Sequence, residues 1–196
     1  MFNRTIINDL KHWKEQKDRK PLMMLGARQV GKTSVLKRFG RECFEHCVYF
    51  SLDEEAGVCD IFRTTKNPTQ IIEQLSYLTD EPILPEKTLL VLDEIQDCPE
   101  AISSMKYFCE KTPEYAIACA GSLLGLAFGH EGFSFPVGKV DHINMYPVTF
   151  SEFLEQKDSG LYRYYKSIDS IEPLPQVFFD RLSQAFTAYR ISGGMP

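Results

Sequence analysis

The sequence predicts an α/β fold in which a five-stranded, mostly parallel sheet lies between layers of helices and is followed by a small helical tail. Over roughly the first 150 residues, short apolar segments alternate with segments of helical period. Several of the apolar segments are apolar almost throughout, which is typical of strands buried on both faces. After about residue 150 only aromatic-rich helical segments follow. Strand–helix alternation of this kind favours a parallel sheet covered by helices.

The expected elements follow from this periodicity. The strands are expected at residues 22–25, 47–52, 88–92, 115–120 and 142–146. The helices are expected at about residues 3–17, 32–39, 67–78 and 99–111. Capping side chains mark the starts of three helices: Asn67 with Gln70, Asp97 alone, and Thr149 with Glu152 as a capping box at the start of the tail.

The composition is that of an ordinary folded protein. Hydrophobic residues make up 43% of the chain, enough for a sizeable core, and the net charge of −5 argues against a broad nucleic-acid surface. The six cysteines are scattered, and the first residues lack the apolar segment of a secretory signal. No run approaches the roughly 18 apolar residues of a membrane span. A cytoplasmic protein with reduced thiols and no membrane partner is expected.

Residues 26–33 read GARQVGKT and lie between an expected strand and an expected helix. In that setting, a glycine, four variable residues and Gly-Lys-Thr predict a phosphate-binding loop rather than a chance strand–turn–helix. The glycines permit a tight wrap whose backbone N–H groups face an anion, and the helix N-terminus adds its dipole. Lys32 is expected to bridge the β- and γ-phosphates, and Thr33 to bind Mg²⁺. The expected nucleotide-binding residues are Gly26, Ala27, Arg28, Gln29, Val30, Gly31, Lys32, Thr33 and Ser34.

A second signal is the apolar strand TLLVLDEIQ at 88–96, which ends in two carboxylates. Asp93 stands at the carboxyl end of this strand, where open α/β sheets bind their ligands, and is expected to hold Mg²⁺ directly or through water. Glu94 is expected to orient and polarise an attacking water as a general base. An acidic pair is also common in ordinary turns, but a phosphate loop about 60 residues upstream favours the catalytic interpretation.

A third polar feature follows the strand in YAIACAGSLLG at 115–125. The Ser122 hydroxyl is expected to contact the γ-phosphate or the attacking water, and capping of the next turn is an equal alternative. Gln96, just after the acidic pair, is a candidate link between nucleotide state and the helix that Asp97 is expected to cap.

Taken together, GARQVGKTSVL, VLDEIQ, AGSLLG, VGKVDHINMYPVTFSEFL and GGMP resemble one large group of proteins. It comprises the prokaryotic ATP-binding proteins of the AAA+ superfamily that are related to the archaeal-type ATPases. The resemblance covers essentially the whole chain. It implies a P-loop NTPase three-layer sandwich, with an extra strand between the P-loop strand and the Walker B strand. It also implies ATP as the nucleotide, Asp93 and Glu94 as the Walker B carboxylates, and Ser122 as the sensor.

The sequence departs from this group at two places. Members commonly read Gly-Arg before the last core strand, whereas this chain has Gly138 and Lys139. Lys139 is therefore expected to contribute a point charge to the transition state without the bidentate fork of arginine, with weaker hydrolysis as the outcome. Members also usually continue past GGMP into further domains. The chain is thus interpreted as an ATPase core at 1–150 and the start of a truncated lid or second domain at 151–196.

The leading functional hypothesis is hydrolysis of ATP with Mg²⁺ that drives or switches an attached C-terminal domain. The alternative is a nucleotide-gated interaction module with negligible hydrolysis. A small-molecule kinase is less favoured, because such enzymes rarely need a water-directing glutamate at position 94. Self-association is an open possibility, and the charge gives no support for direct nucleic-acid binding.

Overall fold

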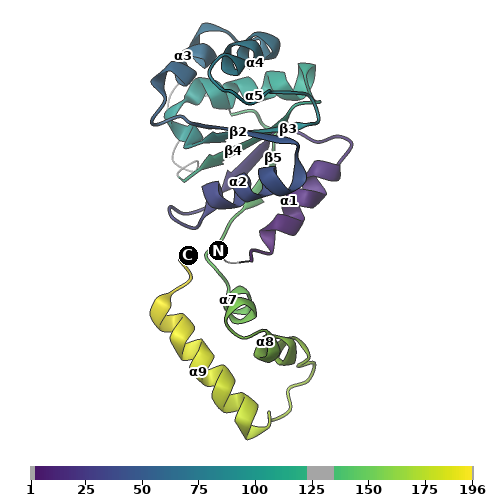
Figure 1. Cartoon of the computed structure of the whole chain (residues 1–196), viewed down its shortest axis with the longest axis vertical. Helices are drawn as coiled ribbons and strands as arrows, with labels where there is room; N and C mark the ends of the chain where they lie inside the picture. Colours follow the sequence, from purple (N-terminus) through teal and green to yellow (C-terminus); the bar gives the residue numbers. More distant parts are fainter. Residues whose placement is uncertain (1–2, 123–134, 196) are drawn as a thin grey trace. The chain divides into compact units, whose positions relative to one another are not determined.

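The computed structural model describes residues 3–122 and 135–195. These residues form two compact units (Figure 1). The larger unit comprises Ile6–Arg28 and Lys32–Met145, and the smaller comprises residues 3–5, Gln29–Gly31 and 146–195. None of the helices in these described parts of the chain combines the length and apolar character needed to cross a bilayer.

The sheet of the larger unit has five strands, all parallel, in the order β2-β3-β4-β1-β5. The fold class predicted from the sequence is confirmed, including the extra strand β4 between β1 and β3. Strands β3 and β4 are buried at every position, which explains why their sequences are nearly continuous apolar runs. The strands are β1 (Leu22–Leu25), β2 (His46–Ser51), β3 (Thr88–Asp93), β4 (Ala116–Gly121) and β5 (Asp141–Asn144).

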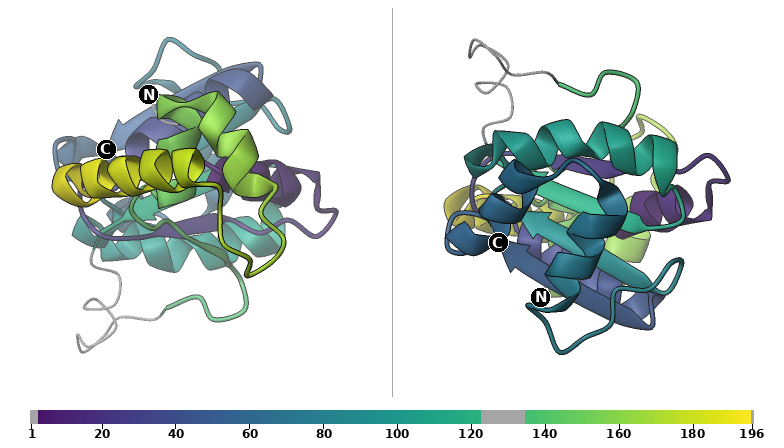
Figure 2. Two further views of the ribbon diagram at one scale, coloured as in Figure 1. Left: turned by 90° about the horizontal axis from the view of Figure 1, so that it is seen from below. Right: turned by 90° about the horizontal axis from the view of Figure 1, so that it is seen from above.

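Helices cover both faces of this sheet (Figures 1 and 2). On one face lie α1 (Ile6–Glu15) and α2 (Lys32–Cys43), and on the other lie α3 (Ala56–Thr64), α4 (Pro68–Ser76) and α5 (Pro99–Lys111). A 3₁₀ turn, η1 (Ile95–Asp97), joins β3 to α5. The first helix begins at Ile6, later than expected, because Arg4 and Thr5 bond to Glu152 instead.

Two of the three predicted helix caps are present. The Asn67 side chain accepts a hydrogen bond from the backbone N–H of Thr69, and Thr149 with Glu152 forms the full capping box. Gln70, however, accepts from the Thr65 hydroxyl and is not a capping partner.

The predicted cap by Asp97 is wrong. Helix α5 begins at Pro99, and its N-cap residue is Cys98, which makes no side-chain cap bond. Asp97 belongs to η1, and its carboxylate accepts from the Gln96 side chain. Proline at the first helical position has no N–H to satisfy, which lessens the need for a cap.

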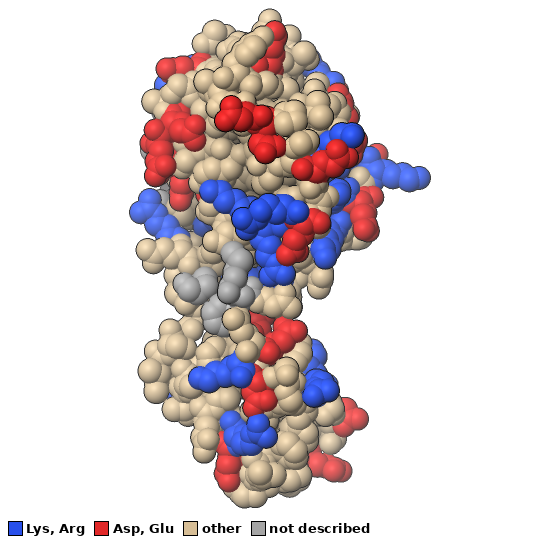
Figure 3. Space-filling model, viewed as in Figure 1, with Lys and Arg blue, Asp and Glu red and all other residues tan. Residues whose placement is uncertain are grey.

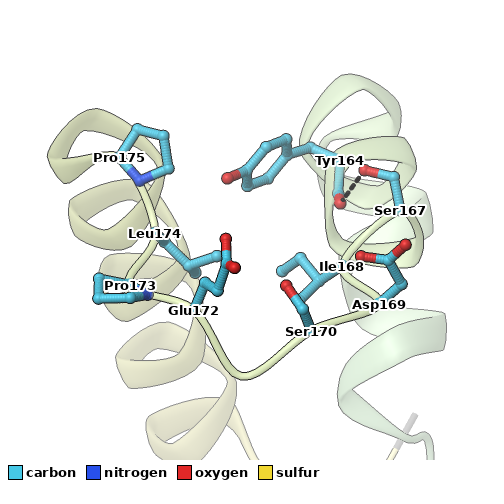
Figure 4. A pocket seen from close by; sticks show the side chains of 9 residues that line it. All are labelled: Tyr164, Ser167, Ile168, Asp169, Ser170, Glu172, Pro173, Leu174 and Pro175. Atoms are coloured by element: carbon cyan, nitrogen blue, oxygen red, sulfur yellow. Dashed lines mark hydrogen bonds between the residues drawn. The ribbon is translucent and has the colours of Figure 1, made fainter.

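The smaller unit contains α7 (Phe150–Lys157), α8 (Ser159–Lys166) and α9 (Gln176–Ser192). Aromatic rings join these helices: Phe150 lies edge-on to Tyr165 and Phe186, and Tyr164 stacks on Phe178 at 3.7 Å. Figure 4 shows a pocket between the end of α8 and the segment that leads to α9. The charged side chains that line it, Asp169 and Glu172, are both acidic, so this pocket does not suit a phosphate.

Candidate functional site

The loop between β1 and α2 contains two left-handed residues in quick succession. Gln29 has a φ of 62° and Gly31 a φ of 92°. Glycine adopts a positive φ without steric cost, which explains the glycine at position 31. Gln29 has a Cβ atom, so the same left-handed region costs it free energy. Such local strain is typical of segments shaped for a ligand.

Gly26 is required for a reason other than the one the sequence suggested. Its φ is not in the left-handed region, but a Cβ there would lie closer than 3.0 Å to the carbonyl oxygen of Met145. The backbone N–H of Met145 donates to the Leu25 carbonyl at 2.6 Å, which holds the two segments together. Only glycine permits this close approach.

The Lys32 ammonium is held at the start of the same loop. It donates to the carbonyl oxygens of Gly26 at 2.9 Å and Ala27 at 2.8 Å. Burial lowers the pKa of Lys32, and the charges of Glu94 and Asp93 oppose that shift. The structure therefore brings this cation under the influence of the two carboxylates at the end of β3.

The other expected loop residues differ in exposure. Val30 is buried, whereas the side chains of Ala27, Arg28, Gln29 and Ser34 are more accessible. On the face seen in Figure 3, acidic side chains predominate over the upper part of the larger unit, and Lys and Arg gather over its lower part with acidic side chains among them. Ion pairs such as Arg38–Glu42 join neighbouring charges. Any attraction for phosphate would therefore come from local groups rather than from a broad positive field.

Asp93 is buried, and its carboxylate accepts three hydrogen bonds from described residues. Its Oδ2 accepts from the Thr33 hydroxyl at 2.5 Å and from the Tyr49 hydroxyl at 3.2 Å, and its Oδ1 accepts from the N–H of Glu94 at 3.0 Å. The Thr33 hydroxyl has only one hydrogen, so its lone pairs stay available to a cation. A hydroxyl and a carboxylate are the hard oxygen ligands that suit Mg²⁺.

Tyr49 was not found from the sequence. It lies on β2 beside β3, paired with Val91, and its side chain reaches Asp93 two residues further on. Burial is the main cause that raises the pKa of its hydroxyl, and the Asp93 charge adds to it. The Lys37 ammonium lies 3.3 Å from the centre of its ring. Knowledge of which strand neighbours β3 is the signal that would have identified this residue.

Glu94 adopts the left-handed conformation, with φ 48° and ψ 46°. For a residue with a side chain, that conformation costs of order 1–3 kcal/mol and is concentrated at functional sites. Its Oε2 accepts a hydrogen bond from Gln96 Nε2 at 2.6 Å. The acidic pair is thus split between two environments, with Asp93 buried and bonded and Glu94 partly exposed at the start of η1.

Ser122 directly follows β4, which pairs with both β1 and β3. It therefore lies at the carboxyl edge of the sheet, the edge at which Thr33, Asp93 and Glu94 also lie. The Ser122 Oγ atom is buried, and it has no hydrogen-bond partner in the described part of the chain. The LLG that follows at 123–125 lies outside the described residues, so the capping alternative stays open.

The structure places Lys139 away from the phosphate loop. Lys139 precedes β5 rather than following it, so it lies at the amino edge of the parallel sheet, opposite the phosphate loop. There its ammonium pairs with Glu110 at 3.0 Å. The physical reason is topological, because a residue before a parallel strand cannot reach a site built after the neighbouring strands.

An all-parallel sheet of this order, with a GxxxxGKT loop after β1 and an acidic pair after β3, defines a P-loop nucleoside-triphosphatase fold. Residues 18–154 match the family described as AAA domain, and the chain belongs to that family. Membership implies that the chain binds a nucleotide. A comparison with curated proteins gave no match.

Several solved structures are distantly similar to this chain. PCH-2 from C. elegans is 11% identical with a TM-score of 0.48, over 90% of this chain and 52% of that one. AMPPCP-bound DnaA from Aquifex aeolicus is 14% identical with a TM-score of 0.43, over 96% and 60%. ORC1 from Aeropyrum pernix, in complex with DNA, is 16% identical with a TM-score of 0.43, over 93% and 53%. The chain thus spans only half to three fifths of the length of these proteins.

Proposed function

We propose that this chain binds ATP with Mg²⁺ at residues 26–34 and hydrolyses it to ADP and phosphate. The observation that carries the proposal is the contact between Thr33 and Asp93, with Glu94 next in sequence. It brings a hydroxyl from the phosphate loop and two carboxylates from β3 to one edge of the sheet. If the loop pattern were a chance match, nothing would require the loop hydroxyl to lie beside these carboxylates.

Each residue has a distinct role in this proposal. Lys32 and the backbone N–H groups at the start of α2 bind the β- and γ-phosphates. Thr33 and Asp93 would hold Mg²⁺, which when bound neutralises phosphate charge. Glu94 accepts a proton from water as the water oxygen bonds to the γ-phosphorus and the bond to the ADP oxygen breaks. Ser122, whose hydroxyl is buried at the same edge, contacts the γ-phosphate.

The test is single-turnover hydrolysis by a Glu94→Gln variant. We expect it to bind ATP with Mg²⁺ about as tightly as the wild-type chain and to form ADP about 10²–10⁴-fold more slowly, the usual contribution of a general base. Unchanged turnover would remove Glu94 from the mechanism. Asp53→Asn, which alters an exposed acid in the turn after β2, is a suitable matched control.

A second candidate is a nucleotide-gated interaction module that hydrolyses ATP negligibly and switches an attached domain. It is favoured by the position of Lys139, which is paired with Glu110 at the far edge of the sheet. In the same single-turnover assay, tight nucleotide binding by the wild-type chain without ADP formation would favour this candidate. In either case, we propose residues 1–150 as the nucleotide-binding core and 151–196 as the start of a further domain.

A further inference from the structure

The Gln96 side-chain amide lies between two carboxylates on the η1 turn. Its Nε2 atom donates to Glu94 Oε2 at 2.6 Å and to Asp97 Oδ2 at 3.2 Å. An ionised carboxylate only accepts hydrogen bonds, so the NH₂ end of the amide must face these two groups. The Oε1 end therefore points away from them.

That Oε1 atom is buried and has no hydrogen-bond partner in the described part of the chain. The only other buried side-chain atom in that state, among residues 3–122 and 135–195, is Ser122 Oγ. The turn η1 lies against β4, which Ser122 directly follows. Buried polar atoms are normally paired, so these two atoms on neighbouring segments lack a partner that a polar ligand or a water would supply once the side chains around them shift to admit it.

The side chain of Gln96 is not needed to close the turn on which it lies. The backbone N–H of Asp97 donates to the Glu94 carbonyl at 3.0 Å, and the N–H of Cys98 donates to the Ile95 carbonyl at 3.1 Å. These two bonds define η1 through the main chain alone. The amide is thus available for a role beyond local structure.

We propose that Gln96 positions the attacking water together with Glu94, an inference that rests on the hydrolysis proposed above. A water molecule has two hydrogens, and two fixed acceptors orient it completely. One hydrogen is donated to Glu94 Oε1, the carboxylate oxygen opposite the one that Nε2 contacts, and passes to it during the reaction; the other is donated across the amide to Gln96 Oε1. The lone pair of the water oxygen is then directed at the γ-phosphorus. Nε2 of the same amide holds the Glu94 carboxylate in place while this occurs.

The experiment compares single-turnover ADP formation and the affinity for a non-hydrolysable ATP analogue in four proteins. They are the wild-type chain, Gln96→Met, Gln96→Glu and Asp97→Asn. Methionine keeps the length of the side chain but neither donates nor accepts strongly. Glutamate keeps an acceptor but loses the donor and adds a charge beside Glu94. Asp97→Asn removes the charge of the other carboxylate that the amide contacts and serves as the matched control.

We expect Gln96→Met and Gln96→Glu to form ADP about tenfold or more slowly, with analogue affinity within about threefold of wild type. Asp97→Asn should retain a rate within about twofold of wild type. A wild-type rate in Gln96→Met would overturn the role of Gln96 and leave the hydrolysis proposal intact. If the Gln96 variants lose analogue affinity as much as rate, or if Asp97→Asn loses as much rate as the Gln96 variants, the structure of the turn rather than the Gln96 amide is responsible, and the proposal is overturned. A wild-type chain that binds ATP and forms no ADP would overturn the hydrolysis proposal itself, and this inference with it.

Discussion

The Thr33 hydroxyl donates a hydrogen bond of 2.5 Å to Asp93, although the two residues are 60 positions apart. The bond joins the first turn of α2 to the last residue of β3, two elements that carry the two strongest motifs in the sequence. Because the hydroxyl gives its only hydrogen to Asp93, its oxygen lone pairs are free for a metal ion. The pair therefore presents a hydroxyl and a carboxylate side by side, the two oxygen ligands that we propose for Mg²⁺.

Replacement of Thr33 by valine should weaken the effect of Mg²⁺ on nucleotide binding. Valine matches threonine in shape but supplies no oxygen, so the metal loses a ligand and Asp93 loses a donor. We expect Mg²⁺-dependent ATP affinity to fall about 10–100-fold, the usual cost of disturbing a metal site, with little change in EDTA. Titration of a fluorescent ATP analogue with and without Mg²⁺ measures this. Thr33→Ser, which keeps the hydroxyl, should behave as wild type, and full Mg²⁺ dependence in Thr33→Val would exclude Thr33 as a ligand.

Tyr49→Phe should weaken the same site by a smaller amount. The variant removes one hydrogen bond to the Asp93 carboxylate and leaves both proposed metal ligands in place, so we expect Mg²⁺-dependent affinity to fall by about tenfold, the low end of the usual cost of losing a group that supports a ligand. The measurement is the same titration, carried out beside Tyr77→Phe. Tyr77 is 78% exposed at the end of α4, so its variant should have no effect. Equal affinities of the two variants would show that Tyr49 does not support Asp93.

The sequence predicts best where one local pattern contains all the information. The loop at 26–33 and the strand before Asp93 are of this kind, because strand burial and the spacing of Gly31, Lys32 and Thr33 can be read within a few residues. Helix α3 was missed because it is only nine residues long and has no side-chain cap. Tyr49 was missed because its partner depends on strand order, which no local pattern gives.

The role of Lys139 stays a prediction to which this structure gives no support. That role was transferred from a resemblance, while the place of Lys139 before the last strand already put it at the opposite edge of a parallel sheet from the phosphate loop. Gly26 is an intermediate case, in which the residue was expected correctly but for the wrong physical reason. Close approach to Met145, and not backbone dihedral angle, excludes a side chain there.

Gly26→Ala should therefore destabilise the larger unit as well as weaken nucleotide binding. The added methyl group would meet the Met145 carbonyl, a backbone atom that is tied to Leu25 and cannot move cheaply. We expect a loss of about 1–3 kcal/mol in the free energy of unfolding, measured by urea denaturation. Gly57→Ala in α3 is the matched control, because nothing lies within 4 Å of the place its methyl group would take, and it should be neutral or stabilise the helix by up to about 1 kcal/mol. Equal stability of Gly26→Ala and wild type would show that the two segments separate easily.

In the smaller unit, Arg4 and Glu152 form a buried ion pair at 3.3 Å, with side chains only 7% and 3% exposed. Arg4 also donates to the carbonyl oxygens of Val30 and Tyr146. Glu152 accepts from the N–H groups of Thr5 and Thr149, both at 2.9 Å. Removing one member of such a pair leaves the other charge buried without its partner, which typically costs about 3–5 kcal/mol.

Glu152→Gln should destabilise the chain at neutral pH, and this difference should shrink in acid. Burial alone would raise the pKa of the Glu152 carboxyl, but the N–H groups of Thr149 and Thr5 and the Arg4 charge outweigh it and hold the pKa below 4.5. Because the pKa of Glu152 is lower in the folded chain than in the unfolded chain, its ionised form stabilises the fold, and this stabilisation is complete at pH values above about 4.5. The stabilisation is lost as the pH falls through the lower pKa of the folded chain, where the carboxylate becomes protonated. Urea denaturation of wild type, Glu152→Gln and the more exposed Glu155→Gln at pH 7 and at several values below 4.5 measures the effect. A wild-type-to-Glu152→Gln difference that stays constant across this range would show that shape, and not charge, makes Glu152 important.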